Sequence, residues 1–558
     1  MTIDIQRTPT AIDKIAEDWV DTLVHLDPTV GTYIGRTAGD GGFGDYSPAG
    51  DERRNREAKK VITLLDATPV ADDVDVVTRT DLRSALALDV ESHEAGLALR
   101  DLNVIASPAQ GIREIFDLMP TKTVDDWENI SSRLAAVPDA MDGYLDTLRE
   151  GIRQGIMPAK RQVREVAIQA KRHAANGGFF ARFAAEASLE SGSLPASLAT
   201  DLAAGARAAA AAYGTLAEFL GGTLESEAPE KDAIGRDLYA LQSRRFLGAT
   251  IDLDETYEWG IEELARMVAE QESIAEQIKP GASVLDAIAF LGTDQSRKLQ
   301  GTQALQTWMQ ETSDRAVAEL SGSQFDIPDE IKRLECMIAP TQEGGIYYTG
   351  PTDDFSRPGR MWWSVPVGVT EFDTWRELTT VYHEGIPGHH LQIGQAVYNR
   401  AKLNTWRRQL AGTSGHAEGW ALYAERLMEQ LGYLDDPADR LGMLDGQRMR
   451  AARVVLDLGV HLEKPLPDGS GPWTADYAFD FLRRNVNMND SFVKFEVNRY
   501  LGWPGQAPSY KVGQRIWEEL RDTYREREGD AFSIKDFHRK ALDLGGVGLD
   551  TLRSAMLG

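Results

Sequence analysis

The spacing of apolar residues restricts this chain to a mainly helical fold. Along most of the 558-residue sequence they recur every three or four positions, which lines one face of an α-helix. Near the start the pattern includes Ile12, Ile15, Trp19, Val20 and Leu23. It continues most clearly over the segments 139–175, 196–222 and 254–277. We therefore predict a mainly α fold with helices over these stretches.

Strand-like sequence is confined to one short region. Gly345–Thr349 and Met361–Val367 carry aromatic and β-branched residues, and the segment between them is rich in Gly and Pro. We predict two short strands joined by a loop, forming a small β-hairpin or sheet inside an otherwise helical protein.

Nothing in the sequence divides the chain sharply. It has no repeat of 20–50 residues and no low-complexity linker. Apolar residues make up 42% and charged residues 26%, which allows a large buried core. We treat residues 1–558 as one helical unit with two tentative lobes, 1–225 and 330–558, whose boundary falls between 225 and 330.

Charge and cysteine content limit the partners and the compartment. A net charge of −27 repels phosphate backbones and anionic lipids, so we expect neither a nucleic-acid nor a membrane partner. The single cysteine, Cys336, allows no intrachain disulfide and is interpreted as a buried small hydrophobe. The first residues lack the pattern of a signal peptide, and no apolar run reaches 18 residues. We expect a cytoplasmic protein.

A cluster of histidines carries the chemistry. Of nine histidines, three lie within the eight residues from His383 to His390, and Glu384 lies among them. Neutral imidazoles beside carboxylates are ligands that zinc prefers. Thr374 and Glu377 have capping-box spacing, which predicts a helix that starts there and presents His383 and Glu384 on its last turns.

The spacing of this cluster departs from the usual zinc-peptidase helix. That motif, His-Glu-x-x-His, places both imidazoles on one helical face with the Glu as general base, but here residue 387 is proline. Seven residues of unbroken helix span about 10.5 Å, too far for two ligands of one zinc ion. We therefore predict a break at Gly385–Gly388. The i+7 phase favours His390 as second ligand and the shorter spacing favours His389, so both remain candidates.

A third ligand is expected on the segment 415–425. Glu418 and Glu425 lie seven residues apart, on one face of a predicted helix. We assign Glu418 as the third ligand. Glu425, or alternatively His416, would orient a ligand imidazole through a hydrogen bond.

These motifs resemble a known family over nearly the whole chain. The sequence is similar to the bacterial family labelled domain of unknown function 885, itself similar to glutamate-ligand zinc peptidases of the angiotensin-converting and thimet oligopeptidase types. That resemblance implies a two-lobed, zincin-like helical fold with a deep cleft, and the roles given above to His383, Glu384 and Glu418. The motifs that carry it are HEGIPGHHLQ, EGWALYAE, EVNRYLGWPGQAPSYKVG, GRDLYALQSRR and GGIYYTGP.

The resemblance also suggests substrate-facing residues near the C-terminus. By analogy, Tyr510, with Tyr500 as second choice, would donate a hydrogen bond to the developing oxyanion. Arg499 or Lys511 would hold a substrate carboxylate.

The predicted strand Gly345–Thr349 suggests a further contact with substrate. An extended peptide would pair with it if it lies at a sheet edge, with Tyr347 and Tyr348 beside the peptide. An ordinary hairpin without a binding role is the alternative interpretation.

The residues together predict a zinc-dependent hydrolase, with a peptide substrate as the leading hypothesis. In this hypothesis zinc activates a water molecule and Glu384 acts as general base. Two alternatives use the same residues: a zinc hydrolase of a non-peptide amide or ester, and a non-catalytic helical binding protein with a structural metal. The intact Glu384 argues against the last, because a structural site has no use for a base.

Overall fold

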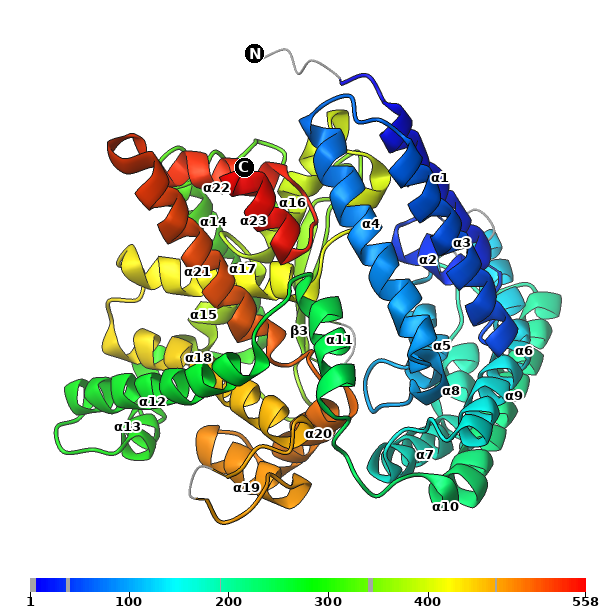
Figure 1. The fold of residues 1–558 in the computed structure, drawn as a ribbon. Coiled ribbons are helices and arrows are strands. Elements are labelled where there is room, and N and C mark those ends of the chain that lie inside the picture. The colour runs from blue at the N-terminus through cyan, green and yellow to red at the C-terminus, as the bar shows by residue number, and fades with distance from the viewer. Residues whose placement is uncertain (1–6, 37–40, 191, 340–344, 467–468) are drawn as a thin grey trace.

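The computed structural model describes residues 7–36, 41–190, 192–339, 345–466 and 469–558, and helices dominate them (Figure 1). The predicted mainly α fold is confirmed. None of the described helices is both long and apolar enough to cross a bilayer.

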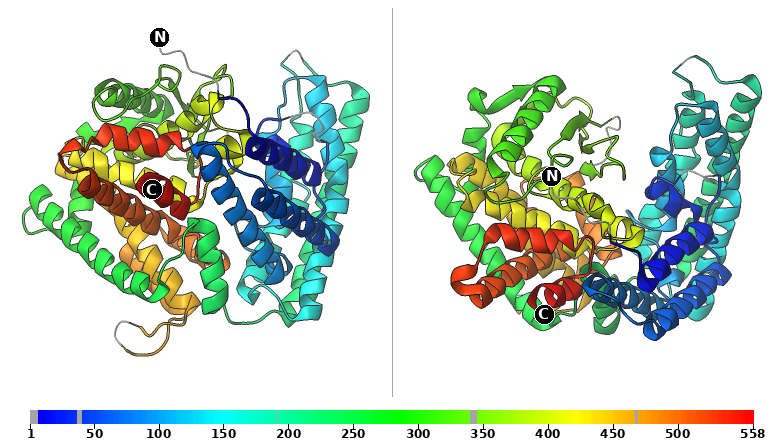
Figure 2. Two further views of the ribbon diagram at one scale, coloured as in Figure 1. Left: turned by 45° about the horizontal axis from the view of Figure 1, so that its top comes forward. Right: turned by 90° about the horizontal axis from the view of Figure 1, so that it is seen from above.

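The helices of the first part of the chain lie together on one side of the molecule (Figure 2, right). The longest of them, α6 (Val124–Gln154), is followed by Gly155 in a left-handed conformation (φ +71°), so the predicted helical stretch 139–175 is two helices. This part of the chain contains α1 (Ala11–Leu26), α2 (Pro28–Tyr33), α3 (Pro48–Ala67), α4 (Asp73–Glu94), α5 (Pro108–Leu118), α6 (Val124–Gln154), α7 (Lys160–Ala174), α8 (Phe179–Ala185), α9 (Ala196–Phe219) and α10 (Glu225–Glu227).

The rest of the chain forms a second, larger group of helices around its own apolar core. The long helix predicted over 254–277 is α12, and it packs along α18. The group contains α11 (Arg236–Leu247), α12 (Leu253–Ile278), α13 (Val284–Leu291), α14 (Gly301–Leu320), α15 (Thr374–Glu384), α16 (His389–Tyr398), α17 (Ser414–Gln430), α18 (Pro437–His461), α19 (Ala475–Asn485), α20 (Asp490–Gly502), α21 (Ser509–Glu528), α22 (Ile534–Asp543) and α23 (Leu549–Leu557).

Each of the two groups of helices has its own apolar core. One core draws on residues 102–228 and another on residues 239–556. A smaller core joins α1, α3 and α4 to Trp406 of the second group. The exact lobe boundaries and the zincin-like cleft stay predictions.

The small sheets lie beside α14 and α15. The predicted hairpin is present as β3 (Ile346–Thr349) antiparallel to β4 (Gly359–Trp363), with Tyr348 opposite Met361. A third strand, β2 (Leu334–Ile338), pairs parallel to β4, so the order is β2-β4-β3. Cys336 is buried on β2, as interpreted from the sequence. A second sheet pairs β1 (Lys298–Gln300) with β5 (Glu371–Asp373).

The predicted start of α15 needs one correction. The N-cap residue is Asp373, and Thr374 is already helical. The Thr374 hydroxyl donates to the carbonyl oxygen of Arg297 at 3.1 Å instead of capping its own helix. The expected capping box with Glu377 is therefore absent, because a tertiary contact takes the hydroxyl.

Candidate metal site

A break between two helices creates the site. Helix α15 ends at Glu384 and α16 begins at His389, with Gly385–Gly388 between them. A Cβ atom on Gly388 would lie 1.9 Å from the carbonyl oxygen of His383, so no larger residue fits there. The break predicted from the sequence thus folds the chain back on itself and returns His389 to the end of α15.

Helix α17 holds this break in place. The indole nitrogen of Trp420 donates to the carbonyl oxygen of Pro387 at 2.9 Å and lies 3.2 Å from that of Gly388. Trp420 is fully buried. Since Glu418 lies two residues before Trp420 on the same helix, the contact that fixes the break also brings Glu418, the expected third ligand, to it.

His383, His389 and Glu418 meet at one point. Nε2 of His383 lies 3.3 Å from Oε2 of Glu418, and Nε2 of His389 lies 3.6 Å from the same oxygen. Ligand atoms at 2.0–2.1 Å from a tetrahedral zinc ion are about 3.3–3.4 Å apart. The Glu418 oxygen is buried and has no hydrogen-bond partner among the described residues. Two imidazoles and one carboxylate therefore fit a zinc ion in both chemistry and spacing.

Glu384 is a second carboxylate beside the same imidazoles. Ligand atoms of His383, Glu384 and His389 all lie within 4.8 Å of one another. Glu418 is the closer of the two carboxylates to both rings, so we assign it as the ligand and leave Glu384 beside the centre. Burial raises the pKa of Glu384, while His389 and His383 partly oppose that shift. A carboxylate of raised pKa next to a metal centre suits a general base.

The structure separates the two candidate histidines. His390 donates from Nε2 to the carbonyl oxygen of Ile331 at 2.7 Å, and its Nδ1 accepts from the Tyr348 hydroxyl at 2.9 Å. Burial lowers its pKa to about 4, which keeps the ring neutral. Both nitrogens are occupied away from Glu418, so His389 takes the metal-facing place. The i+7 argument for His390 was wrong because the break resets the helical phase.

Tyr348 and Tyr347 lie on opposite faces of β3. Tyr348 points inward and its hydroxyl bonds His390. It is therefore not available to a substrate, contrary to the expectation from the sequence. Tyr347 is 39% exposed and stacks on Trp362, with ring centroids 6.2 Å apart. Because β3, like β2, is an edge strand of its sheet, its outer edge is one with which an extended peptide could pair, as the sequence suggested.

Glu425 orients His383 from behind. Its Oε1 accepts from Nδ1 of His383 at 2.7 Å, and its other oxygen accepts from Gln447 at 3.3 Å. The bond fixes the tautomer that leaves Nε2 of His383 facing Glu418. The alternative partner, His416, lies against Trp517 instead, with its Nδ1 3.4 Å from Gln392. Of the two residues considered from the sequence, Glu425 fills the orienting position.

The imidazoles and carboxylates of the cluster shift one another's pKa values. Burial alone would lower the pKa of His383, but the carboxylates of Glu418 and Glu425 outweigh it and raise the pKa to about 10. Burial would raise the pKa of Glu418, yet His383 and His389 hold it well below its usual range. A proton on His383 thus supplies the positive charge that a metal ion would supply in its place.

Helix α21 approaches the cluster through two glycines. A Cβ atom on Gly419 of α17 would lie 2.4 Å from the carbonyl carbon of Gly513 on α21. This close packing brings Tyr510, on the first turn of α21, near Glu418. Burial raises the pKa of Tyr510, and the charge of Glu418 adds to the shift. The phenol therefore stays protonated and able to donate.

The other C-terminal residues are engaged in structural contacts. The Tyr500 hydroxyl donates to Glu496 and accepts from Arg453, and the side chain is fully buried. Arg499 pairs with Glu496 at 3.3 Å and with Gln506 at 2.6 Å.

Lys511 corrects another expectation. Its ammonium group bonds Gln447 at 2.6 Å, Glu263 at 2.9 Å and Gln514 at 3.0 Å, in a site where it is 2% exposed. These partners take all three of its donors. Lys511 is therefore a buried structural cation and has no donor left for a substrate carboxylate.

Another arginine, Arg450, which the sequence analysis did not single out, is a better candidate than Arg499 or Lys511 for holding a substrate carboxylate. Arg450 follows Gln447 by three residues and precedes Arg453 by three, so all three share one face of α18. Gln447 donates to Glu425, and Arg453 lies over the Tyr510 ring at 5.0 Å. The buried Nε of Arg450 has no hydrogen-bond partner among the described residues. Only its spacing from Gln447 and Arg453 could have indicated it, and nothing in the sequence places those two at the site.

The fold and site together define a helical protein with a buried His–His–Glu cluster built on a broken helix. The chain belongs to the family described as bacterial protein of unknown function, DUF885, whose model matches residues 28–556. No curated protein matches the sequence.

Two solved structures share the fold over nearly the whole chain. A protein from Colwellia psychrerythraea is 22% identical, with a TM-score of 0.85 and 98% of each chain covered. One from Shewanella oneidensis is 17% identical, with a TM-score of 0.74, and covers 99% of this chain and all of its own. Both carry the name "putative lipoprotein". At these identities the likeness concerns the fold alone, and the cytoplasmic location of this chain stays a prediction.

Proposed function

We propose that this protein is a zinc-dependent hydrolase that cleaves peptides. The observation that carries the proposal is the convergence of His383, His389 and Glu418 on one point with Glu384 beside them. A structural zinc site is normally closed by four protein ligands, whereas a catalytic site has three and an adjacent base. The cluster has the second composition.

The residues of the chain take distinct roles in this proposal. A zinc ion held by His383, His389 and Glu418 would supply Lewis acidity toward water and the scissile carbonyl. Glu384 takes the proton of the attacking water and passes it to the leaving amine. Tyr510 donates a hydrogen bond to the carbonyl oxygen as negative charge develops on it. Glu425 keeps the His383 ring in register.

Two features favour a peptide over another amide or ester. The free edge of β3 can accept an extended backbone by strand addition, and β3 also holds His390 through Tyr348. Arg450, with an unpaired donor on the face of α18 toward Glu425, suits the carboxylate of a peptide end or acidic side chain.

The test combines metal content with a peptide-library digest. Purified protein should contain about one zinc ion per chain and cleave peptides, and a chelator should abolish cleavage until zinc is restored. Zinc without cleavage of any peptide would move the proposal to a non-peptide substrate. Protein that neither contains zinc nor takes it up would refute it.

A further inference from the structure

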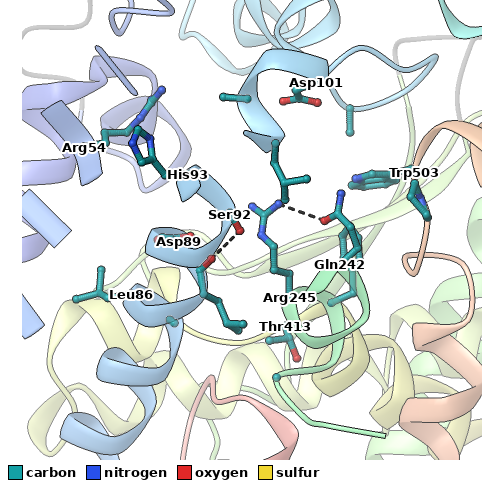
Figure 3. A pocket seen from close by; sticks show the side chains of 18 of the residues that line it. Arg54, Leu86, Asp89, Ser92, His93, Asp101, Gln242, Arg245, Thr413 and Trp503 are labelled. Atoms are coloured by element: carbon teal, nitrogen blue, oxygen red, sulfur yellow. Dashed lines mark hydrogen bonds between the residues drawn. The ribbon is translucent and has the colours of Figure 1, made fainter. Parts of the chain in front are cut away.

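A large cavity lies outside the metal site. Its volume is about 750 Å³, within the range of small-molecule sites, roughly 300–1,000 Å³. Its walls come from α3, α4 and the turn Leu97–Arg100 on one side and from α11 and the segment before α21 on the other (Figure 3). None of the cluster residues His383, Glu384, His389 and Glu418 lines it.

Charged side chains face this cavity without partners. Five charged residues of the cavity wall form no ion pair within 4.0 Å and no side-chain hydrogen bond to an opposite charge among the described residues. They are Arg54, Arg100, Arg245, Asp89 and Asp101. This is unusual in a chain whose surface arginines mostly pair with carboxylates. Arg244, next to Arg245, illustrates the norm, because it bonds Glu91 on the outside.

Arg245 occupies the middle of the cavity. Its one side-chain hydrogen bond among the described residues goes to the side-chain oxygen of Gln242 at 3.3 Å. Figure 3 shows its guanidinium between Asp89 on one side and Asp101 on the other, with Trp503 beyond Gln242. Arg245 influences both carboxylates electrostatically without bonding either. Around Arg245 the cavity therefore offers a cationic position flanked by two anionic ones.

Two amide side chains belong to the cavity wall. Asn55 and Gln162 line the cavity, and the side-chain oxygen of each is closed off from solvent and has no hydrogen-bond partner among the described residues. Burial raises the pKa of Asp101 to about 6, although the charge of Arg245 opposes the shift. Arg245, Asp89 and Asp101 are exposed to the cavity, so a ligand that enters it can reach their charges directly.

From this arrangement we infer that the cavity binds a zwitterion of amino-acid or short-peptide size. The ligand carboxylate lies against Arg245, and the ligand ammonium lies against Asp101 or Asp89. A phosphate-rich ligand is disfavoured, because two aspartates would repel it. Apolar wall residues such as Leu86 and Trp503 accommodate side chains.

The cavity touches the helix that carries Glu418. Thr413 lines the cavity and caps α17 by accepting from the backbone of His416 at 3.3 Å. Glu418 lies five residues further on, about 7.5 Å along the helix. The two sites are therefore neighbours, and a test must distinguish them. The inference itself does not depend on hydrolytic activity.

The experiment measures binding calorimetrically in the full chain carrying Glu384→Gln, which prevents turnover. The probes are trialanine, its N-acetyl form, its C-terminal amide and the doubly blocked form. We expect trialanine to bind and each single block to weaken binding about tenfold or more, the value of one charge-assisted hydrogen bond. Arg245→Gln and Asp101→Asn should each weaken the binding of trialanine by a similar factor.

Matched controls show whether trialanine binds in the cavity or at the metal-site cluster. Arg244→Gln changes the neighbouring arginine outside the cavity and should leave the affinity unchanged. Binding should also survive a chelator, because the cavity contains no metal ligand of the cluster. Melting curves check that each variant folds. The inference is overturned if trialanine fails to bind at millimolar concentration, if the doubly blocked peptide binds equally well, if Arg245→Gln and Asp101→Asn have no effect, or if chelation abolishes binding.

Discussion

The metal-site cluster and the cavity arrange their charges in opposite ways. In the cluster, each imidazole faces a carboxylate within 3.6 Å, and Glu425 completes the back of His383 at 2.7 Å. In the cavity, Arg245 influences Asp89 and Asp101 but bonds neither. The first arrangement is preorganised around a single point, as a small ion requires. The second leaves its charges apart, as a larger ligand with separated charges requires.

Their origin in the chain differs as well. The cluster lies on α15, α16 and α17, which follow one another in sequence and pack in one apolar core. The cavity is enclosed by α3 and α4 from one group of helices and α11 from the other. Local sequence can specify the cluster, whereas only the packing of distant segments creates the cavity.

The largest expected effect is on catalysis in the cluster. Glu384→Gln keeps the shape of the side chain but removes its basicity, so turnover of a cleaved peptide should fall about 10²–10⁴-fold. Zinc content should not change, because Glu418 is the carboxylate closer to both imidazoles. Steady-state kinetics and elemental analysis on the same sample check this.

A matched control lies on the same helix. Glu377 is another carboxylate of α15, and burial raises its pKa to about 7, but it lies outside the cluster. Glu377→Gln should leave turnover and zinc content near those of the parent. Undiminished activity in Glu384→Gln would contradict the assignment of the base.

The next effect separates the adjacent histidines. His389→Gln removes a metal-facing imidazole. Zinc affinity should therefore fall by more than the roughly 10–100-fold that follows loss of a residue that only hydrogen-bonds a metal ligand. His390→Gln removes the contacts to Tyr348 and Ile331, so it should lower the free energy of unfolding by about 1–3 kcal/mol and leave zinc affinity nearly intact. Competition with a zinc dye and urea unfolding measure the two quantities. Equal zinc affinity in both variants would contradict the geometry.

The sequence predicted the break but not the histidine. On an unbroken helix His383 and either later histidine would lie too far apart to bind one metal ion, and Gly385, Pro387 and Gly388 allow the helix to break between them. The choice between His389 and His390 depends on the path of the chain through the break and on Ile331, a residue far away in sequence. Such contacts leave no local pattern.

Other differences have the same physical cause. Thr374 has a capping-box spacing with Glu377, but its hydroxyl bonds Arg297 across the fold. Strand β2 was missed because its partner β4 lies about 20 residues further along the chain and parallel to it. Lys511 resembled a substrate contact, yet its buried site supplies three partners, two of them, Gln447 and Glu263, from other helices.

A smaller effect concerns substrate anchoring by Arg450. Arg450→Met retains much of the apolar stem and removes the guanidinium, so KM should rise about tenfold for substrates that owe binding to a carboxylate. The same substrate with that carboxylate amidated should show little change. Arg448→Met is the control on α18, because Arg448 bonds Gln271 and Asn485 instead. An equal change in KM for both substrates would mean that Arg450 only balances the charge of nearby carboxylates.

The smallest effect tests the cost of an unpaired charge in the cavity. The native pKa of Asp101 is about 6, mainly through burial, against an ordinary value of 3.8. The native state therefore binds more protons than the unfolded state between these values, so the contribution of Asp101 to stability falls as pH rises from about 4 to 6 and stays low above. Cavity water screens the carboxylate, so we expect a penalty on the order of 1 kcal/mol rather than the full shift.

Asp101→Asn should remove this penalty and the pH dependence that comes with it. The variant should be more stable than the parent at pH 7 and equal to it near pH 4, as measured by urea unfolding at both values. Stabilisation together with weaker trialanine binding would show that the charge is retained for a ligand at the expense of the free protein. A variant less stable at pH 7 would instead show that Asp101 stabilises the fold through Arg245, and the contrast between a paired cluster and an unpaired cavity would fail at its central residue.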